Sequence, residues 1–160
     1  LGALPDAVVL AKSLGGGVPV GALLARGNAA RALAPGDHGS TFGGNHLACA
    51  AAYYVTNKLV HTDLMAHVAE TGAYFIEQLR ALRQTCAAVA EVRGRGLMLG
   101  VELDESVSAK DVQKQLLHAG FVTATAGRNV LRFLPPYVIH THHIDSLCAA
   151  LDAALTNARV

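Results

Sequence analysis

The stretch Ala7-Val8-Val9-Leu10-Ala11-Lys12-Ser13-Leu14-Gly15-Gly16-Gly17 places a lysine between a short apolar run and three glycines. The run 7–11 follows a Pro-Asp pair and contains β-branched residues, so it predicts a buried strand. A lysine at the end of such a strand can lie in a dry cleft, where desolvation disfavours the charged ammonium form. A neutral amine can then attack an aldehyde and form an imine. The alternative is a solvated lysine before a flexible turn, and the stretch alone leaves both interpretations open.

Outward from Lys12, the pattern of apolar residues changes character near residue 60. Before that point it predicts a second strand over 18–25, a glycine-rich loop over 34–45 and a helix over 46–59 that is apolar on most faces and therefore buried. After that point it predicts, in order, a helix over 63–83, the segment 89–95, strands over 97–103, 121–125 and 130–133 with a helix over 108–118 among them, and a last helix from Thr141. We therefore expect an α/β fold in which 1–60 ends a larger sheet domain and 61–160 forms a small α+β domain.

A second motif, His38-Gly39-Ser40-Thr41-Phe42-Gly43-Gly44-Asn45, stands directly before the helix predicted from residue 46. Hydroxyl groups and glycines at a helix start suit an anion, because free N–H groups and the helix dipole both favour a phosphate. The alternative is an ordinary loop in which Ser, Thr or Asn caps the helix. The motif by itself is compatible with either role.

A third motif, Leu131-Arg132-Phe133-Leu134-Pro135-Pro136, places one arginine inside an apolar strand. A buried guanidinium is costly without a partner, so the pattern predicts a carboxylate facing Arg132. That carboxylate belongs either to a substrate, which the planar fork binds through two hydrogen bonds, or to a structural Asp or Glu. In the glycine-rich turn Arg93-Gly94-Arg95-Gly96 we expect Arg93 to pair locally and the glycines to serve the backbone.

Composition excludes several classes of protein. Hydrophobic residues make up 52% of the 160 residues and charged residues 16%, which favours a packed fold over disorder. The net charge of +1 with no basic patch argues against nucleic-acid binding, and no apolar run is long enough for a membrane span. Three widely spaced cysteines indicate reduced thiols and a cytoplasmic location. The histidines at 140, 142 and 143 lack the further ligands of a metal site, so no metal is expected.

Taken in order, these segments resemble the class III (ornithine-type) aminotransferases, which depend on pyridoxal phosphate (PLP). The resemblance covers essentially the whole chain. It is carried by Pro5-Asp6, by Ala11-Lys12 with the segment 15–22, and by the segments 38–45, 93–100 and 131–136. It implies a type I PLP-dependent transferase fold, with 1–60 as the C-terminal end of the large PLP-binding domain and 61–160 as the small C-terminal domain.

The resemblance also implies a role for each candidate residue. Lys12 would be the catalytic lysine that forms the cofactor Schiff base and moves a proton. Thr41 would bind the cofactor phosphate in the neighbouring subunit, so a homodimer with shared active sites is implied. Ser40 would lie near cofactor and substrate, and Arg132 would bind the α-carboxylate of the amino-acid substrate.

The activity implied is transfer of a terminal amino group to a 2-oxo acid, with N2-acetylornithine as donor and 2-oxoglutarate as acceptor, a step of arginine biosynthesis. Alternatives are another ω-amine donor (ornithine, succinylornithine or 4-aminobutyrate), a PLP-dependent isomerase or decarboxylase, and a truncated, non-catalytic dimerisation piece. The chain begins at Leu1 and enters an apolar run almost at once, which is typical of a piece of a longer chain. The family's aspartate for the pyridine nitrogen would lie upstream, so we expect residues 1–160 alone not to transaminate at a useful rate.

Overall fold

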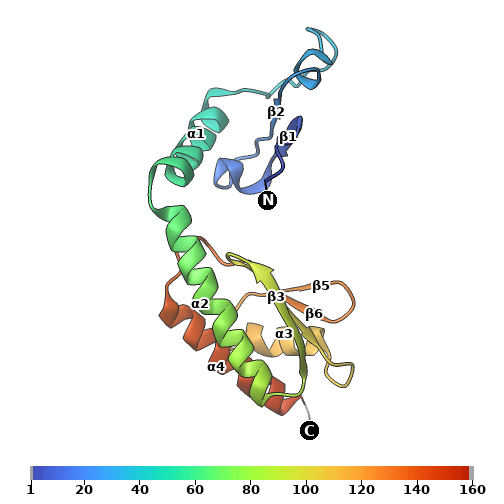
Figure 1. The fold of residues 1–160 in the computed structure, drawn as a ribbon, viewed down its shortest axis with the longest axis vertical. Helices are drawn as coiled ribbons and strands as arrows, with labels where there is room; N and C mark the ends of the chain where they lie inside the picture. The colour runs from blue at the N-terminus through green and yellow to red at the C-terminus, as the bar shows by residue number, and fades with distance from the viewer. Residues whose placement is uncertain (1, 159–160) are drawn as a thin grey trace. The chain divides into compact units, whose positions relative to one another are not determined.

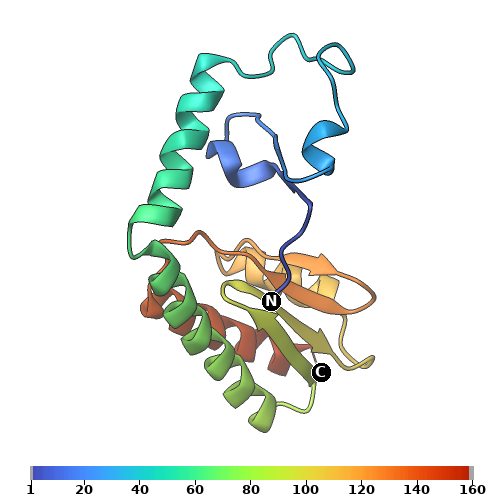
Figure 2. The same ribbon diagram turned by 45° about the horizontal axis from the view of Figure 1, so that its top comes forward.

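The computed structural model describes residues 2–158, and the chain divides into two compact units, Leu1–Thr62 and Asp63–Val160. The boundary falls at the short break between two helices, α1 and α2 (Figures 1 and 2). This break lies close to residue 60, where the apolar pattern of the sequence changes character.

The first unit combines a two-stranded sheet with one long helix. Its elements are strand β1 (Ala7–Leu10), the 3-10 turn η1 (Lys12–Gly15), strand β2 (Ala22–Ala25), the 3-10 turn η2 (Ala29–Arg31) and helix α1 (His46–His61). The strands are antiparallel, with Ala7 opposite Ala25 and Leu10 opposite Ala22. The strand expected over 18–25 is shorter at its start, where Pro19 has no N–H to donate to a sheet.

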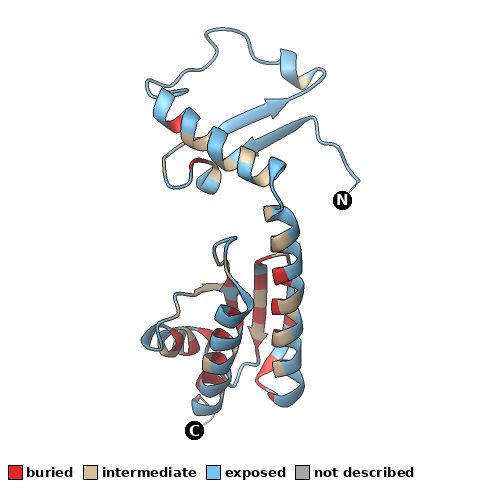
Figure 3. Cartoon of the chain, turned by 90° about the vertical axis from the view of Figure 1, so that its left-hand side faces the viewer, coloured by how far each residue is buried: buried red, intermediate tan, exposed pale blue. Residues whose placement is uncertain are grey.

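Burial in the first unit differs from the sequence prediction. All residues of β1 and β2 are exposed, and Ala48 is the buried residue of α1, so the predictions of a buried strand and a buried helix are wrong for this unit (Figure 3). The reason is that α1 packs against the η1 turn and does not lie across the strands. Large apolar side chains therefore face outward, among them Val9 at 76% and Tyr53 at 73% exposure.

The second unit is a four-stranded antiparallel sheet with three helices packed on one face. Its elements are α2 (Leu64–Thr85), β3 (Val89–Arg95), β4 (Met98–Leu103), α3 (Ala109–His118), β5 (Ala124–Ala126), β6 (Val130–Phe133) and α4 (Thr141–Asn157). The strand order is β3-β4-β6-β5. The expected helix, strand, helix, two strands and helix are all present, and β5 begins three residues later than the sequence pattern indicated.

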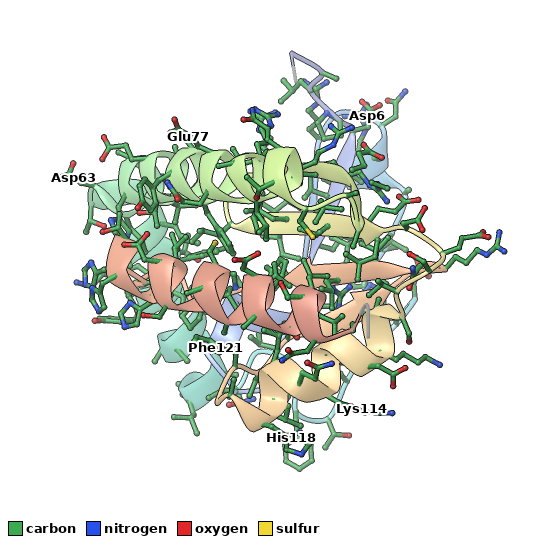
Figure 4. The ribbon with its side chains drawn as sticks, turned by 90° about the horizontal axis from the view of Figure 1, so that it is seen from below. Asp6, Asp63, Glu77, Lys114, His118 and Phe121 are labelled. Carbon is green, nitrogen blue, oxygen red and sulfur yellow. The ribbon has the colours of Figure 1, made fainter. Side chains whose placement is uncertain are left out.

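The core of the second unit lies between the sheet and its helices. Alternate strand residues such as Leu99, Val101 and Leu131 point into it and are at most 2% exposed. Helices α2 and α4 lie side by side over the sheet, and the labelled side chains of Glu77 and Lys114 point away from the core (Figure 4). Burial is concentrated here, as Figure 3 shows, so this unit has the hydrophobic core that the first unit lacks among the described residues.

Gly72 lies where α2 approaches the turn between β3 and β4 closely. A Cβ atom at this position would fall against the backbone of Gly96, with the Gly96 Cα at 2.7 Å and its carbonyl closer still. Ala favours a helix over Gly by about 1 kcal/mol, but overpacking a core costs about 1–3 kcal/mol, and more when the obstacle is rigid backbone. Because the obstacle is backbone, the cost lies at the upper end of this range, and we expect Gly72→Ala to lower the free energy of unfolding by about 2 kcal/mol in urea denaturation.

Gly39→Ala is the matched control for this measurement. A Cβ at Gly39 meets no atom within 4 Å, and its backbone φ is not in the left-handed region. The free energy of unfolding of this variant should stay close to that of the parent. A Gly72→Ala protein as stable as the control would show that α2 and the turn at Gly96 do not approach as closely as described.

Candidate functional site

Lys12 has an unusual backbone conformation at the end of β1. The strand ends at Leu10, Ala11 is extended, and Lys12 begins the η1 turn with φ 57°, in the left-handed region. Among residues 2–158 it is the one non-glycine residue with positive φ. This conformation costs an L-residue roughly 1–2 kcal/mol. Such strain is typical of residues whose position serves a function.

The environment of Lys12 corrects part of the sequence prediction. Its side chain is exposed, and no hydrogen bond or ion pair joins the amine to any group in the described part of the chain. The expected dry cleft is therefore not formed by the first unit, because β1 and β2 are uncovered and α1 reaches the η1 turn without enclosing it. The described residues of the first unit supply the amine and its strained support, but they do not exclude water from it.

The loop before α1 is held by its backbone and by Asn45. The Asn45 side chain accepts a hydrogen bond from the Ala48 N–H at 2.9 Å and donates one to the Phe42 carbonyl at 2.8 Å. The Gly43 N–H donates to the Ser40 carbonyl at 3.1 Å. Of the three capping candidates, Asn45 is therefore the N-cap of α1. Within residues 2–158 the hydroxyl groups of Ser40 and Thr41 have no hydrogen-bond partner, which leaves them available to a ligand.

A hollow of about 460 Å³ lies between this loop and the segment that leads into β2. Its lining comes from Pro19, Val20, Gly21, Ser40, Phe42, Gly43, Gly44, Asn45 and Ala48. The N-terminus of α1 opens at this hollow, and helix N-termini attract anions. Ser40 belongs to the lining, whereas Lys12 and Thr41 do not, so this hollow does not join all three residues.

The free groups of the first unit suit a ligand that carries an aldehyde and a phosphate. An amine without a partner can condense with the aldehyde. Hydroxyl groups beside a helix N-terminus can hold the phosphate. The chemistry of these donors therefore fits the two ends of the cofactor that the sequence resemblance implies. Lys12 suits the aldehyde, and the 40–41 hydroxyls suit a phosphate, which under that resemblance belongs to the cofactor of the neighbouring subunit.

Arg132 lies on the side of the sheet opposite the core, which corrects the expectation that it is buried. Its neighbours Leu131 and Phe133 point into the core, and the alternation of a strand turns Arg132 outward, where it is exposed. Its cross-strand neighbours are Gly100 on β4 and Ala124 on β5. No carboxylate of the described residues forms an ion pair with it. The prediction from the sequence took an apolar strand to be buried on both faces, whereas the helices cover only one face of this strand.

A second arginine on the same face is fully engaged. The Arg93 guanidinium donates to Glu102 at 2.5 Å and to Glu91 at 2.7 Å, so the expected local pairing of Arg93 is confirmed. The hydrogen bond to Glu102 is the main cause that raises the pKa of the Arg93 guanidinium above its usual value. Sequence reasoning did not connect this network with Arg132, because the strand register that relates them is not visible in the sequence.

Residues 2–158 form neither a metal site nor a membrane-spanning helix. The described His, Cys, Asp and Glu side chains include no group of three placed to hold a metal ion. The described helices include none that is long and apolar enough to cross a bilayer. The candidate site residues therefore remain Lys12, Ser40 and Thr41 in the first unit and Arg132 in the second.

Comparison with known proteins gives a consistent result. The family model described as "Aminotransferase class-III" matches residues 1–155. Acetylornithine aminotransferase of Methanocaldococcus jannaschii is 45% identical over 161 aligned residues, which cover 99% of this chain and 39% of the relative. The chain thus spans about two fifths of the length of the curated relatives it matches.

Solved structures of related enzymes share the fold. Acetylornithine aminotransferase from Elizabethkingia anophelis superimposes with a TM-score of 0.87 at 30% identity, over 97% of this chain and 42% of the other. Plasmodium falciparum ornithine δ-aminotransferase superimposes with a TM-score of 0.89 at 30% identity, over 99% of this chain and 41% of the other. Both units together therefore correspond to one contiguous part of these larger folds.

Proposed function

This chain belongs to the class III aminotransferases, which use PLP, and from that premise we propose that it is the Lys12-bearing part of an enzyme that moves the terminal amino group of N2-acetylornithine to 2-oxoglutarate. Identity of 38–48% to eight acetylornithine aminotransferases supports this donor. The reaction is a step of arginine biosynthesis, and its location is the cytoplasm.

The observation that carries the proposal is the state of Lys12. Its amine is unpaired in the described chain, and its backbone is held in a conformation that costs energy at the end of a strand. A lysine with only a structural role has no need of this conformation, which Gly adopts without cost. The strain is consistent with an amine held in one direction for a covalent partner.

Each candidate residue has a proposed task. When bound, PLP supplies an electron sink for the carbon that carries the amino group. Lys12 would hold the cofactor through Nζ, and its amine would also move a proton at that carbon. The Thr41 hydroxyl binds phosphate, Ser40 lies beside cofactor and substrate, and Arg132 binds the substrate α-carboxylate through its planar fork.

The exposure of the first unit fits a part of a larger assembly. We propose that 1–60 ends the large PLP-binding domain, that 61–160 is the small domain, and that the whole protein is a homodimer. In the dimer, Thr41 serves the site of the partner subunit. The rest of the large domain and the partner would then cover Lys12 and exclude the water that the first unit admits.

A panel of amino donors tests the proposed reaction. The whole protein with PLP is given 2-oxoglutarate and, separately, N2-acetylornithine, succinylornithine, ornithine and 4-aminobutyrate, and glutamate formation is measured. We expect the highest kcat/KM with N2-acetylornithine. Failure to consume 2-oxoglutarate with every donor would contradict an aminotransferase and favour an isomerase or a decarboxylase of the same fold.

Ornithine is the second candidate donor. The likeness to the Plasmodium falciparum ornithine enzyme, with a TM-score of 0.89, is as good as that to the acetylornithine enzyme from Elizabethkingia anophelis. The fold of this part therefore does not separate the two donors. In the same panel, a kcat/KM for ornithine above that for N2-acetylornithine would decide for this alternative.

A further inference from the structure

On the face of the sheet away from the core, one carboxylate, Glu102, lies near two arginines, Arg93 and Arg132. The register places Arg93 on β3 and Arg132 on β6 directly opposite Gly100 of β4, one on each side. Glu102 lies two residues further along β4, on the same face as Gly100. It is therefore the diagonal neighbour of both arginines, within reach of long side chains.

Glu102 forms its ion pair with Arg93 and not with Arg132. It accepts a hydrogen bond from the Arg93 Nη1 at 2.5 Å, and the same nitrogen donates to Glu91 at 2.7 Å. Glu91 and Glu102 are directly opposite each other across the strands, so without Arg93 two like charges would face one another. Arg93 thus pairs with both carboxylates at once and offsets one of their two negative charges, and both side chains of the Arg93–Glu102 pair remain nearly half exposed.

The surroundings of Arg132 are correspondingly open. Its two cross-strand neighbours are Gly100, which has no side chain, and Ala124, which has the smallest one. Gly100 leaves the position opposite Arg132 without a side chain of its own, and Val130 Cγ1 lies 3.3 Å from where a Cβ of residue 100 would be. The one acidic side chain placed diagonally to it on β4 is Glu102, and Arg93 already binds that group.

We propose that Arg93 is a positioning residue that keeps Glu102 away from Arg132 and so preserves the Arg132 guanidinium for the carboxylate of the substrate. This inference rests on the proposed function of Arg132. In the absence of Arg93, Glu102 would turn to the nearest remaining cation, because a like charge at Glu91 repels it toward β6. A substrate carboxylate would then have to displace Glu102 before it could bind.

The test compares four variants of the whole protein with PLP: Arg93→Ala, Glu102→Gln, the Arg93→Ala/Glu102→Gln double variant, and Arg95→Ala. Arg95 is the matched control, since it lies on the same strand and face and forms no ion pair with a described residue. The KM for the amino donor, the KM for the 2-oxo acid and kcat are measured. An exposed ion pair is weak, so we expect Arg93→Ala to raise both KM values about fivefold with little change in kcat.

The double variant separates positioning from a structural role. A glutamine carries no charge to compete for Arg132, so the double variant should return both KM values to those of the parent, and Glu102→Gln alone should leave them there. If Arg93→Ala has no effect on KM, if the double variant does not restore it, or if Arg95→Ala has the same effect, the positioning role is overturned.

The outcome at Arg132 itself distinguishes this inference from the function beneath it. If Arg132→Leu raises KM and Arg93→Ala does not, the carboxylate site stands and the role of Arg93 is wrong. If Arg132→Leu leaves KM unchanged, the proposed site is wrong and the positioning role falls with it.

Discussion

Replacement of Lys12 by alanine in the whole protein is expected to abolish transamination, with kcat reduced at least about 10³-fold. The residue has two tasks, covalent attachment of PLP and proton transfer, and loss of a positioned acid–base group alone costs about 10²–10⁴-fold. Alanine has a Cβ and pays the same cost for the left-handed backbone. The thermal midpoint should therefore change little, so lost activity would not reflect unfolding.

Borohydride reduction provides a direct readout of the attachment. Reduction of the parent protein with PLP should attach the reduced cofactor permanently to residue 12, and peptide mapping locates the modified residue. Lys58→Ala is the control: that lysine is on α1, 5.6 Å from the centre of the Tyr54 ring, and has no task in the proposed chemistry. Attachment of the reduced cofactor to another lysine, or a Lys12→Ala protein that transaminates at the parent rate, would contradict the assignment of Lys12.

Arg132→Leu is expected to raise the KM for both carboxylate substrates by about 100-fold. Leucine fits an exposed strand position but offers neither charge nor the two parallel hydrogen bonds of a guanidinium to a carboxylate. Arg132→Lys should recover part of the loss, because an ammonium group supplies charge without the fork. Steady-state kinetics with donor and 2-oxo acid varied separately measure both effects.

Stability serves as the control for this prediction. Arg132 is outside the core and forms no ion pair with the described residues, so neither variant should shift the urea midpoint appreciably. Unchanged KM values in Arg132→Leu would place the carboxylate site elsewhere. A large loss of stability would instead indicate that Arg132 has a structural partner in the rest of the protein.

Much of the second unit could be predicted because its elements obey local rules. The helix α3 begins after Ser108, whose side chain accepts from the Asp111 N–H as the capping pattern indicates, and Gly120 with φ 91° stops it. The three helices bury one apolar stripe each against the sheet. The spacing of apolar residues is sufficient to predict such elements, because the core that buries those residues is formed by the same stretch of chain.

Burial in the first unit could not be predicted, because the unit does not itself cover its apolar residues. Apolar runs at β1 and α1 indicate burial, but in this unit the described residues leave them exposed. A sequence pattern tells which residues favour an apolar environment, not whether the same chain provides it. The dry cleft expected around Lys12 failed on this point, although the position of the lysine at the strand end was correct.

The sequence by itself determined the order of strands and helices, the lysine after β1, the hydroxyl loop before α1 and, through five ordered motifs, the family. Local patterns of neighbouring residues predict the elements and place the lysine and the loop, whereas the family rests on the resemblance of the five motifs to known members. Only the tertiary structure decided that Asn45 takes the capping task from Ser40 and Thr41, and that Arg132 faces away from the core opposite Gly100 and Ala124. Residues of β4 and β6 that lie directly opposite each other are 28–34 positions apart in the chain, so the register between these strands decides which charges meet.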